Sequence, residues 1–411
     1  MCPGCYKPKF ERYCPACRKQ LFDGAKVSHV LPFDPPKDDN LAMYQEQTMR
    51  LSISGVQLKY SLRREGDELV LTDHDGQYIL KPIPPVAHIR LAGQAPENEH
   101  LTMQIASGIF GIGTAANALI YFKDGTPAYL TRRFDLKEDG SKFLQEDMAQ
   151  LSGRSRQTSG EHFKYQGTYE EIGDLIRRYV PAYLPALEAF FRVVVFNYLF
   201  SNGDAHLKNF SLVQTDMGDY ALSKAYDLMS TVLHTPNESD TALDLYENDM
   251  DNEFYRVFGC YGQENFRALA GKVGINTKRT ERILTNMLSS KDKVLAMING
   301  SFLDSDIKQQ YAQAYLEKLR RLGMTRSLIV SALNPKKSKG TMPLDVTARL
   351  NFLRGPSLTG VFRPDQDTDE LHGQNKYCFV KQEHLRAYEQ TQDAGLLTII
   401  AADMLTSVGR I

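Results

Sequence analysis

The sequence predicts an α+β fold in two parts, a β-rich first half followed by a larger helical half. Between about residues 50 and 135, short apolar runs alternate with turn sequences, two of which contain Asp-Gly. Such turns between alternating apolar runs are typical of antiparallel hairpins. Between about residues 143 and 330 the apolar residues recur with helical spacing. The 411 residues, 42% of them hydrophobic and 24% charged, suffice for two or three domains with a large buried core.

Each half contains a short series of expected elements. Strands are expected at 51–64, 68–73, 78–83, 117–122 and 128–134. One helix interrupts them at 96–111, where Leu101, Ile105 and Ile109 recur every four residues. Helices in the second half are expected at 143–153, 169–179, 182–200, 266–274, 281–290 and 306–323. The run at 182–200 is the most apolar, but its three polar residues favour a buried core helix over a membrane span.

The charge of the chain excludes some classes of partner. The chain has 49 basic and 50 acidic residues, so no global field would attract nucleic acid or an anionic membrane. Any basic site must therefore be local. The N-terminus lacks the apolar region of a signal peptide. We therefore expect a cytoplasmic protein that does not associate with membranes.

Four of the six cysteines lie within the first seventeen residues, as Cys2-x-x-Cys5 and Cys14-x-x-Cys17. In a reducing cytosol such clustering indicates a metal rather than disulfides. Two such knuckles can ligate Zn²⁺ tetrahedrally, and four thiolates leave no open position, so the zinc would be structural. The connection of eight residues is shorter than in the usual zinc ribbon, and unliganded thiols are the alternative interpretation.

A polar loop follows the expected core helix. Residues 201–213, SNGDAHLKNFSLV, present Asp204 and Asn209 five positions apart before apolar sequence resumes. Phosphoryl transfer needs a carboxylate that orients the attacking hydroxyl and an amide oxygen on a metal ion, and protein-kinase catalytic loops have both at this spacing. The spacing alone is a weak signal, because an ordinary solvated turn also produces it.

Two further charged residues strengthen the phosphoryl-transfer interpretation. Asp227 follows Asn209 by eighteen residues, where a second carboxylate would hold Mg²⁺ against the β- and γ-phosphates. Lys81 lies inside an expected strand, where a buried ammonium needs an anion such as phosphate. Glu99 in the next helix is the candidate partner of Lys81, and Glu97 is its rival. The order of these residues along the chain is that of a two-lobed kinase.

With these residues in place, the sequence resembles the HipA-type serine/threonine kinase toxins of bacterial toxin–antitoxin systems. The resemblance is carried by SISGVQLKYSL (52–62), LKP (80–82), NEHLTMQIA (98–106), RRFD (132–135), EDMAQLSG (146–153), NGDAHLKNFSL (202–212) and AYDLMST (225–231). These motifs cover about residues 45–330 in the family's order. The resemblance implies a two-lobed protein-kinase-like fold, with a β-rich N-lobe and an α-helical C-lobe, that binds ATP and Mg²⁺.

The resemblance also implies domain boundaries. We expect a Cys-rich zinc-knuckle-like segment at 1–24, a kinase N-lobe at 45–140, a kinase C-lobe at 141–333, and a linker with an unassigned tail at 334–411. Full-length family members usually carry an extra N-terminal subdomain before the kinase core, whereas here the S-I-S-G motif begins at residue 52. We therefore expect a short form that works with a separate small protein in a three-component operon or uses its Cys-rich segment instead.

Roles for individual residues follow from the same resemblance. Asp204 would be the catalytic base, Asn209 and Asp227 would hold Mg²⁺, and Lys81 would bind the phosphates of ATP. Nucleotide contacts are implied for three aromatic or imidazole side chains: Phe134 at the hinge, His206 in the loop, and Tyr226 beside Asp227. For His206 the alternative is that it only braces the loop by hydrogen bonding.

The segment SISGVQLK replaces the glycine-rich phosphate loop of ordinary kinases. It has a single glycine, Gly55, so backbone donors approach a phosphate at fewer places. Ser52 matches the loop serine that family members autophosphorylate, and Ser54 is a second candidate. A phosphate there would add charge where the phosphates of ATP must lie, and so would silence the kinase. The alternative is an ordinary strand-edge serine.

The resemblance implies a protein substrate, typically an aminoacyl-tRNA synthetase, and inhibition by a helix-turn-helix antitoxin. DNA would then be contacted only through the antitoxin. Two alternatives remain. One is a kinase of small molecules or lipids, because G-D-x-H-x-x-N also resembles the catalytic loop of phosphoinositide kinases. The other is a non-catalytic binding protein, against which the intact set Lys81, Asp204, Asn209 and Asp227 argues.

Overall fold

The computed structural model describes residues 1–37, 58–84 and 89–324. The chain divides into two compact units, one of Met1–Asp244 with Ala270–Leu319 and the other of Leu245–Leu269 with Arg320–Ile411. Every described residue of the candidate site belongs to the first unit. In the second unit, the buried carboxylate of Asp249 accepts hydrogen bonds from the backbone N–H of Leu245 and the hydroxyl of Tyr261, at 2.6 and 2.7 Å.

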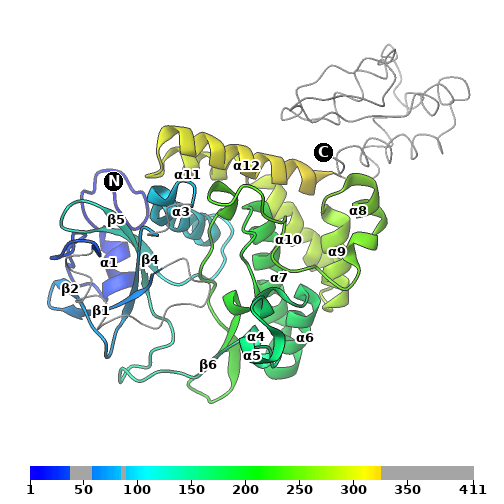
Figure 1. The fold of residues 1–411 in the computed structure, drawn as a ribbon, viewed down its shortest axis with the longest axis horizontal. Helices are drawn as coiled ribbons and strands as arrows, with labels where there is room; N and C mark the ends of the chain where they lie inside the picture. The colour runs from blue at the N-terminus through cyan, green and yellow to red at the C-terminus, as the bar shows by residue number, and fades with distance from the viewer. Residues whose placement is uncertain (38–57, 85–88, 325–411) are drawn as a thin grey trace, which may run out of the picture. The chain divides into compact units, whose positions relative to one another are not determined.

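A five-stranded antiparallel sheet forms the first lobe of the first unit (Figure 1). Its strands are β1 (Tyr60–Glu65), β2 (Glu68–Leu71), β3 (Tyr78–Pro82), β4 (Asn117–Tyr121) and β5 (Pro127–Arg132). They lie in the order β2-β1-β3-β5-β4, so β4 is an edge strand. The strands expected from the sequence at 68–73, 78–83, 117–122 and 128–134 are confirmed.

One of the two expected Asp-Gly hairpins is wrong. The turn 123–126 joins the paired strands β4 and β5, as expected. The turn 74–77 instead joins β2 to β3, which do not pair with each other because both pair with β1. The β1–β2 hairpin closes through Gly66 and Asp67, and Gly66 takes the positive φ of 62° that so short a turn requires.

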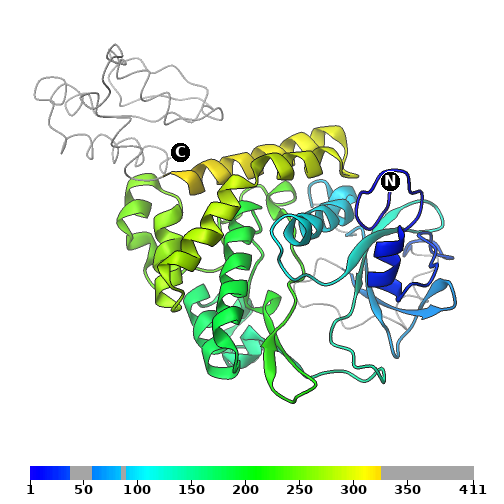
Figure 2. The same ribbon diagram turned by 180° about the vertical axis from the view of Figure 1, so that it is seen from behind.

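Side-chain alternation decides what covers each face of the sheet. Leu80 on β3 and Leu130 on β5 belong to a buried cluster with Leu21 and Phe22 of helix α1 (Pro15–Phe22). Figure 2 shows α1, in dark blue, beside the strands. Lys81, one position along from Leu80, therefore falls on the opposite face, which packs against helix α3 (Ala95–Gly108).

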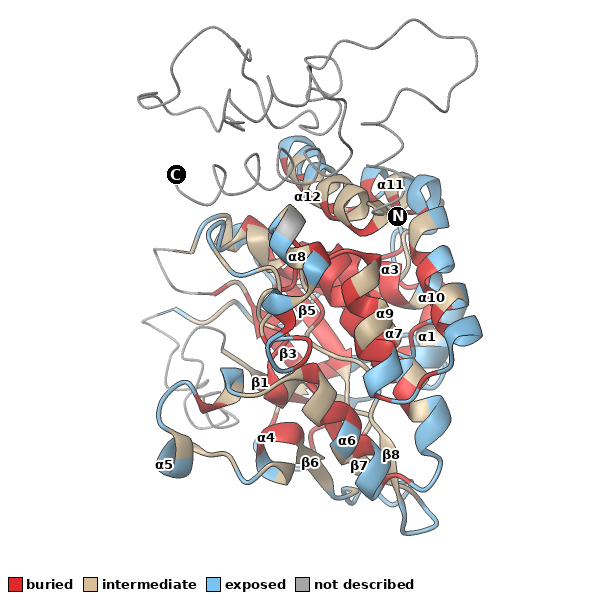
Figure 3. Ribbon diagram, turned by 90° about the vertical axis from the view of Figure 1, so that its right-hand side faces the viewer, coloured by how far each residue is buried: buried red, intermediate tan, exposed pale blue. Residues whose placement is uncertain are grey.

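Helix α3 is buried on nearly all sides, and Figure 3 shows most of it coloured as buried. Several of its polar side chains are hydrogen-bonded to residues of the second lobe. The amide of Asn98 donates to the carbonyl of Ser230 at 2.9 Å and accepts from its N–H at 3.1 Å. The hydroxyl of Thr102 lies 2.8 Å from that of Tyr311. These bonds fix the helix that carries Glu99.

The second lobe is mainly helical. Its elements are β6 (Gln145–Asp147), α4 (Met148–Leu151), α5 (Arg156–Ser159), α6 (Tyr169–Tyr179), α7 (Tyr183–Leu199), β7 (Ser211–Gln214), β8 (Tyr220–Leu222), α10 (Thr277–Ser289) and α11 (Lys291–Asn299). The other helices in the described ranges are α8 (Glu253–Phe258), α9 (Gln263–Lys272) and α12 (Ser305–Gly323), with the short 3₁₀ helices η1 (Ala92–Gln94), η2 (Phe163–Tyr165), η3 (Leu207–Asn209), η4 (Thr231–Leu233) and η5 (Asp249–Asp251); α8 and η5 belong to the second unit. The core helix expected at 182–200 is confirmed as α7. No helix in the described ranges is long and apolar enough to cross a bilayer.

The helix expected at 143–153 is wrong in its first part. Only Met148–Leu151 is helical, whereas Gln145–Asp147 is strand β6, paired with β7. Asp147 caps the helix by accepting from the N–H of Gln150 at 2.9 Å, while the side chain of Gln150 accepts from the N–H of Asp147 at 3.0 Å. This capping box starts the helix at Met148 and leaves the preceding residues extended.

Strands β6, β7 and β8 form a small antiparallel sheet next to the loop 201–210, which runs directly into β7. Helix α7 leads into this loop and β7 leads out of it. The hairpin of β7 and β8 then returns the chain to Asp227, next to the isolated bridge between Thr114 and Ala225. Residues separated by eighteen positions or more are in this way brought to one side of the lobe.

Candidate active site

Lys81, on strand β3, is a deeply buried charged group of the site. Its ammonium lies 2.5 Å from Glu99 Oε1 on α3 and 2.5 Å from Asp227 Oδ1, which follows strand β8. The side chains of Lys81 and Glu99 are only 3% and 1% exposed. Of the two expected partners the structure selects Glu99. Glu97 is also buried, but its Oε2 has no hydrogen-bond partner among the described residues.

The charges of these groups determine one another. Burial alone would lower the pKa of Lys81, but the attraction of Asp227 and Glu99 outweighs it and raises the pKa well above its ordinary value. Burial would raise the pKa of Asp227, yet Lys59 and Lys81 hold it well below its usual range. Burial raises the pKa of Glu99, and Lys81 opposes that shift. Lys81 and Asp227 are therefore ionised at neutral pH.

Lys59 is a site residue to which the sequence interpretation gave no role. Its ammonium lies 3.2 Å from Asp227 Oδ2, so each carboxylate oxygen of Asp227 faces one lysine. Lys59 ends the SISGVQLK segment, whose residues Ser52, Ser54 and Gly55 lie outside the described residues. The two lysines put two cations at the position where a polyphosphate could bind. The position of Lys59 directly after the phosphate-loop segment was the available signal.

Asn209 and Asp227 border one small cavity, so the structure brings the two expected metal ligands together. The amide nitrogen of Asn209 donates to the backbone carbonyl of Asp204 at 2.9 Å. This bond does not use the amide oxygen of Asn209, Oδ1. Asp227 has a left-handed backbone, with φ of 55°. Such strain in a non-glycine residue is typical of functional sites. One amide oxygen and one carboxylate fit Mg²⁺, which prefers oxygen ligands.

Asp204 is more accessible than the other expected catalytic groups Lys81 and Asp227, whose side chains are 3% and 28% exposed. Its side chain is 47% exposed, as a group that must meet a substrate requires. Its Oδ1 accepts a hydrogen bond from the hydroxyl of Tyr165 and lies 3.8 Å from the ammonium of Lys164. Both of these neighbours come from η2, a segment to which the sequence interpretation gave no role, since no motif spacing links η2 to the loop 201–213.

The pKa of Lys164 depends on its burial and on the charged groups around it. Burial lowers its pKa, and the like charges of Lys208 and Lys59 lower it further, while Asp204 and Asp227 act in the opposite direction. Lys164 and Lys59 each lie beside an aspartate of the site, Asp204 at 3.8 Å and Asp227 at 3.2 Å. The site has the mixed charge expected for one that holds both a metal ion and phosphate groups.

His206 lies beside this group and is nearly buried. Its Nε2 is 3.7 Å from Asp204 Oδ1, and its ring contacts that of Tyr165 with centroids 5.2 Å apart. Burial lowers the pKa of His206 to about 4, so the imidazole is neutral at pH 7. Its Nδ1 is buried without a hydrogen-bond partner among the described residues. The contact with Asp204 is too long for a hydrogen bond, so both the nucleotide contact and the loop-bracing alternative stay predictions.

Phe134 and Tyr226 lie together next to Asp227, which directly follows Tyr226. Their ring centroids are 5.8 Å apart. The Tyr226 hydroxyl donates to the carbonyl of Lys208 at 2.9 Å and lies 2.6 Å from the hydroxyl of Ser211. The two rings thus connect the segment after β5 with the strand end before Asp227, where a hinge between the lobes is expected to meet adenine.

Glu238 is a further residue that the sequence did not reveal. Its Oε1 accepts from the hydroxyl of Thr231 at 2.6 Å and lies 3.4 Å from the N–H of Gly203. A Cβ on residue 203 would lie 2.6 Å from the Glu238 carboxyl carbon, so only glycine permits this approach. Burial raises the pKa of Glu238 to about 7. Glu238 therefore supports the loop immediately before Asp204.

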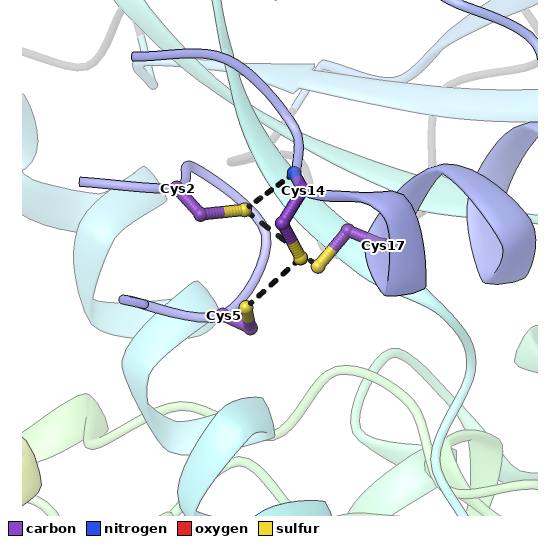
Figure 4. A group of neighbouring side chains, drawn as sticks. All are labelled: Cys2, Cys5, Cys14 and Cys17. Carbon is purple, nitrogen blue, oxygen red and sulfur yellow. Dashed lines mark hydrogen bonds between the residues drawn. The ribbon is translucent and has the colours of Figure 1, made fainter. Parts of the chain in front are cut away.

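The four N-terminal cysteines form a second candidate centre. Figure 4 shows their sulfur atoms pointing toward one another. All four lie within 4.8 Å of each other, with 3.7 Å between the sulfurs of Cys2 and Cys17 and 3.6 Å between those of Cys5 and Cys14. These distances exclude disulfide bonds. Sulfurs that ligate Zn²⁺ at about 2.3 Å in a tetrahedron lie about 3.8 Å apart, so the cluster fits zinc.

Local backbone features support the same fit. A Cβ on Gly4 would lie 2.7 Å from the sulfur of Cys17, so a larger residue would prevent the cluster from closing. The N–H of Cys14 donates to the sulfur of Cys2 at 3.2 Å, the kind of outer hydrogen bond that orients a metal ligand. The cluster could therefore hold a structural Zn²⁺, as expected from the paired Cys-x-x-Cys spacing.

Comparison of the chain with known proteins identifies a family and several relatives. The HipA-like C-terminal domain matches residues 51–295. A protein named "Putative kinase" from Haemophilus influenzae is 24% identical over 319 residues, which cover 74% of this chain and 90% of that protein. "Putative kinase Y4dM" from Sinorhizobium fredii is 32% identical over 228 residues, which cover 51% of this chain and 53% of the relative.

A solved structure shares the fold. It is the HipA of Shewanella oneidensis MR-1 in complex with HipB and its operator DNA, with a TM-score of 0.52 and 20% identity over 71% of this chain and 73% of that chain. The expected two-lobed, kinase-like α+β fold is thereby confirmed. Because the match at 51–295 spans more than half of the 411 residues, the chain belongs to the family of the HipA-like C-terminal domain.

Proposed function

We propose that this protein is an ATP-dependent serine/threonine protein kinase that acts as the toxin of a toxin–antitoxin module. The observation that carries the proposal is the buried set Lys81, Glu99 and Asp227, which joins both lobes at the edge of the loop that holds Asp204 and Asn209. A lysine paired with a helix glutamate, next to a carboxylate that can hold magnesium, is the arrangement that phosphoryl transfer from ATP requires.

In the proposed reaction each residue has one task. Lys81 and Lys59 bind the phosphates of ATP, Phe134 and Tyr226 flank the adenine, and Asn209 and Asp227 hold Mg²⁺. The ion, when bound, neutralises charge on the β- and γ-phosphates. Asp204 orients the substrate hydroxyl and accepts its proton as the oxygen bonds to the γ-phosphorus and ADP leaves. The Tyr165 hydroxyl, which donates to Asp204 Oδ1, lies where a substrate hydroxyl would donate.

The toxin role and its partners extend this proposal. The related HipA of Shewanella oneidensis was solved with HipB and operator DNA. By analogy we propose an antitoxin partner with a helix-turn-helix, through which alone DNA is contacted. The family resemblance favours an aminoacyl-tRNA synthetase as the protein substrate. It also favours autophosphorylation on Ser52 or Ser54, a few positions before Lys59 in the sequence. The added phosphate would repel the phosphates of ATP and so would silence the kinase.

We further propose that Cys2, Cys5, Cys14 and Cys17 bind one structural Zn²⁺. The support is the distance between opposite sulfurs, 3.6 and 3.7 Å, and the absence of any disulfide among these four residues. The ligated segment would stabilise the first lobe, because Cys2, Cys14 and Cys17 are part of the same buried cluster as the sheet. In this proposal the kinase N-lobe, which the zinc-binding segment stabilises, spans residues 45–140, and the kinase C-lobe spans residues 141–333.

The activity is tested by replacing Asp204. Wild type incubated with ATP and Mg²⁺ is expected to gain phosphate on Ser52 or Ser54, detected by intact mass and peptide mapping. Asp204→Asn should slow this gain roughly 10²–10⁴-fold, because the group that orients the hydroxyl is lost. Asp216→Asn, in the exposed turn between β7 and β8, is the matched control and should behave as wild type.

Expression of the same three proteins in a bacterial host tests the toxin role. Wild type and Asp216→Asn should arrest growth and add phosphate to serine or threonine of a host protein, whereas Asp204→Asn should do neither. Equal growth and identical phosphosites in all three strains would contradict the proposal, and phosphate on a sugar or lipid instead would favour the small-molecule alternative.

The choice between the two helix glutamates gives a second prediction. Glu99→Gln should lower the catalytic efficiency for ATP on the order of tenfold or more, because Lys81 loses one of its two anionic partners. Glu97→Gln should stay within about twofold of wild type, because glutamine mimics the protonated acid that burial favours at Glu97. Steady-state kinetics at several ATP concentrations measure both. Equal losses in the two variants would contradict the assignment of Glu99.

A pH effect on stability follows from Glu238. Its pKa rises from an ordinary 4.5 to about 7 in the folded protein, so the folded state binds more protons than the unfolded state between these values. The free energy of unfolding therefore falls as the pH rises through this window. Glu238→Gln removes this contribution, and on the order of 2 kcal/mol of the wild-type decrease should disappear after solvent screening.

Urea unfolding of both proteins at several pH values from 4.5 to 8 measures this difference. Contributions from other groups, such as Glu97 and His206, are common to both proteins and cancel in the comparison. Parallel stability curves for wild type and Glu238→Gln would show that the Glu238 carboxyl is not held in the protonated form.

A further inference from the structure

The knuckle formed by Cys2 and Cys5 carries an aromatic residue in a strained backbone position. Tyr6, which follows Cys5, has φ of 61°, in the left-handed region where glycine is favoured. Its N–H donates to the carbonyl of Cys2 at 3.0 Å, and the N–H of Cys2 donates to the carbonyl of Lys7 at 3.0 Å. These bonds close the knuckle into a tight turn. Strain of this kind in a bulky residue persists only where the surroundings impose it, and indicates a functional constraint.

The Tyr6 ring lies between the two lobes. Its centroid is 5.0 Å from that of His100 on α3 and 5.5 Å from that of Phe302, which follows α11 in the helical lobe. Aromatic pairs at these distances contribute about 0.5–1.5 kcal/mol beyond their buried area. The Tyr6 ring therefore links His100 on α3 to Phe302 in the second lobe.

His100 is the residue next to Glu99, the partner of Lys81. Its Nδ1 lies 3.0 Å from Asn117 Oδ1 on β4, while its Nε2 is buried without a hydrogen-bond partner among the described residues. No described hydrogen bond therefore positions the imidazole through Nε2. The contact with the Tyr6 ring is the other interaction that positions it. A shift of His100 would move Glu99 with it, because both belong to one turn of the helix.

The base of the knuckle is fixed to the sheet. The N–H of Leu119, on edge strand β4, donates to the carbonyl of Pro3 at 3.0 Å, and the hydroxyl of Tyr13 donates to the carbonyl of Leu119 at 2.7 Å. The knuckle thus has one attachment on β4 and a second, through Tyr6, on α3. A rigid knuckle would set the distance between this strand and this helix.

We propose that Tyr6 is a positioning residue for phosphoryl transfer: a thiophilic divalent ion in the Cys2, Cys5, Cys14 and Cys17 cluster makes the knuckle rigid, and Tyr6 then holds α3 so that Glu99 meets Lys81. Removal of the ion relaxes the turn at Tyr6 and loosens α3. The nucleotide site is thereby coupled to the occupancy of the metal site. Only the kinetic consequence rests on the proposed kinase function.

The test uses the full chain in four forms: wild type, Tyr6→Ala, Tyr6→Phe, and Lys7→Ala as the control in the exposed neighbouring position. Zinc per chain is measured by elemental analysis, and hydrogen exchange is followed by mass spectrometry in peptides covering 95–108. One zinc per chain is expected in all four. Exchange in α3 should rise in Tyr6→Ala but stay at the wild-type level in Tyr6→Phe, which keeps the ring, and in Lys7→Ala.

Zinc removal by a chelator should raise exchange in wild-type α3 to the level of Tyr6→Ala, and zinc restored to the chelated protein should reverse the rise. Chelation should change α3 little in Tyr6→Ala, because the link is already broken. Unchanged protection of α3 in Tyr6→Ala, unchanged protection after chelation, or no zinc bound at all would each overturn the proposal.

Kinetics separate positioning from simple loss of folded protein. In Tyr6→Ala the KM for ATP should rise about tenfold or more, because misplacement of Glu99 weakens the pairing that orients Lys81. A variant that merely unfolds in part would show a lower kcat at unchanged KM, and that result would overturn the positioning role. If wild type folds and binds zinc but transfers no phosphate, only the kinase proposal is contradicted. The hydrogen-exchange measurements would still decide whether zinc and Tyr6 position α3.

Discussion

The charge pairing of Lys81 is the interaction on which the site depends. A fully buried ammonium is costly unless anions surround it, and here Glu99 and Asp227 supply them at 2.5 Å each. Removing one member of such a buried set typically costs about 3–5 kcal/mol, whereas a well-packed apolar replacement can be neutral. The set is therefore better explained by chemistry than by stability. Since its members come from β3, α3 and the segment after β8, the pairing requires both lobes in their observed arrangement.

The sequence predicted the residues whose spacing along the chain carries information. Asp204 and Asn209 lie in one short loop, and the order of Lys81, this loop and Asp227 is set by topology, so linear motifs sufficed. Lys164, Tyr165 and Glu238 were missed because they reach the site from segments with no fixed spacing to it, and only tertiary packing brings them there. The sequence favoured Glu99 over Glu97 as the partner of Lys81 but could not decide between them, because both are buried and only tertiary packing shows which one meets Lys81.

Local turn chemistry explains the fold-level errors. The Asp-Gly turn at 74–77 was expected to make a hairpin, but a shorter turn at Gly66 had already paired β2 with β1. The helix expected from residue 143 begins at Met148, because the cap at Asp147 ends the extended strand. The Cys-rich segment was expected from its spacing, yet its packing was not. Its residues share one buried cluster with the sheet and cover the edge strand β4, which would otherwise expose unpaired backbone groups.

The proposed function requires Asp227, which here pairs with Lys59 and Lys81, to bind Mg²⁺ when the nucleotide is present. Calorimetric titration of ATP into wild type and Asp227→Asn, each with and without Mg²⁺, tests this directly. Wild type should bind ATP more tightly with Mg²⁺ than without it. In Asp227→Asn the affinity should be nearly the same in both conditions, because the carboxylate that receives the ion is gone. If Asp227→Asn kept the full strengthening by Mg²⁺, the metal would be held elsewhere and the central assignment would be wrong.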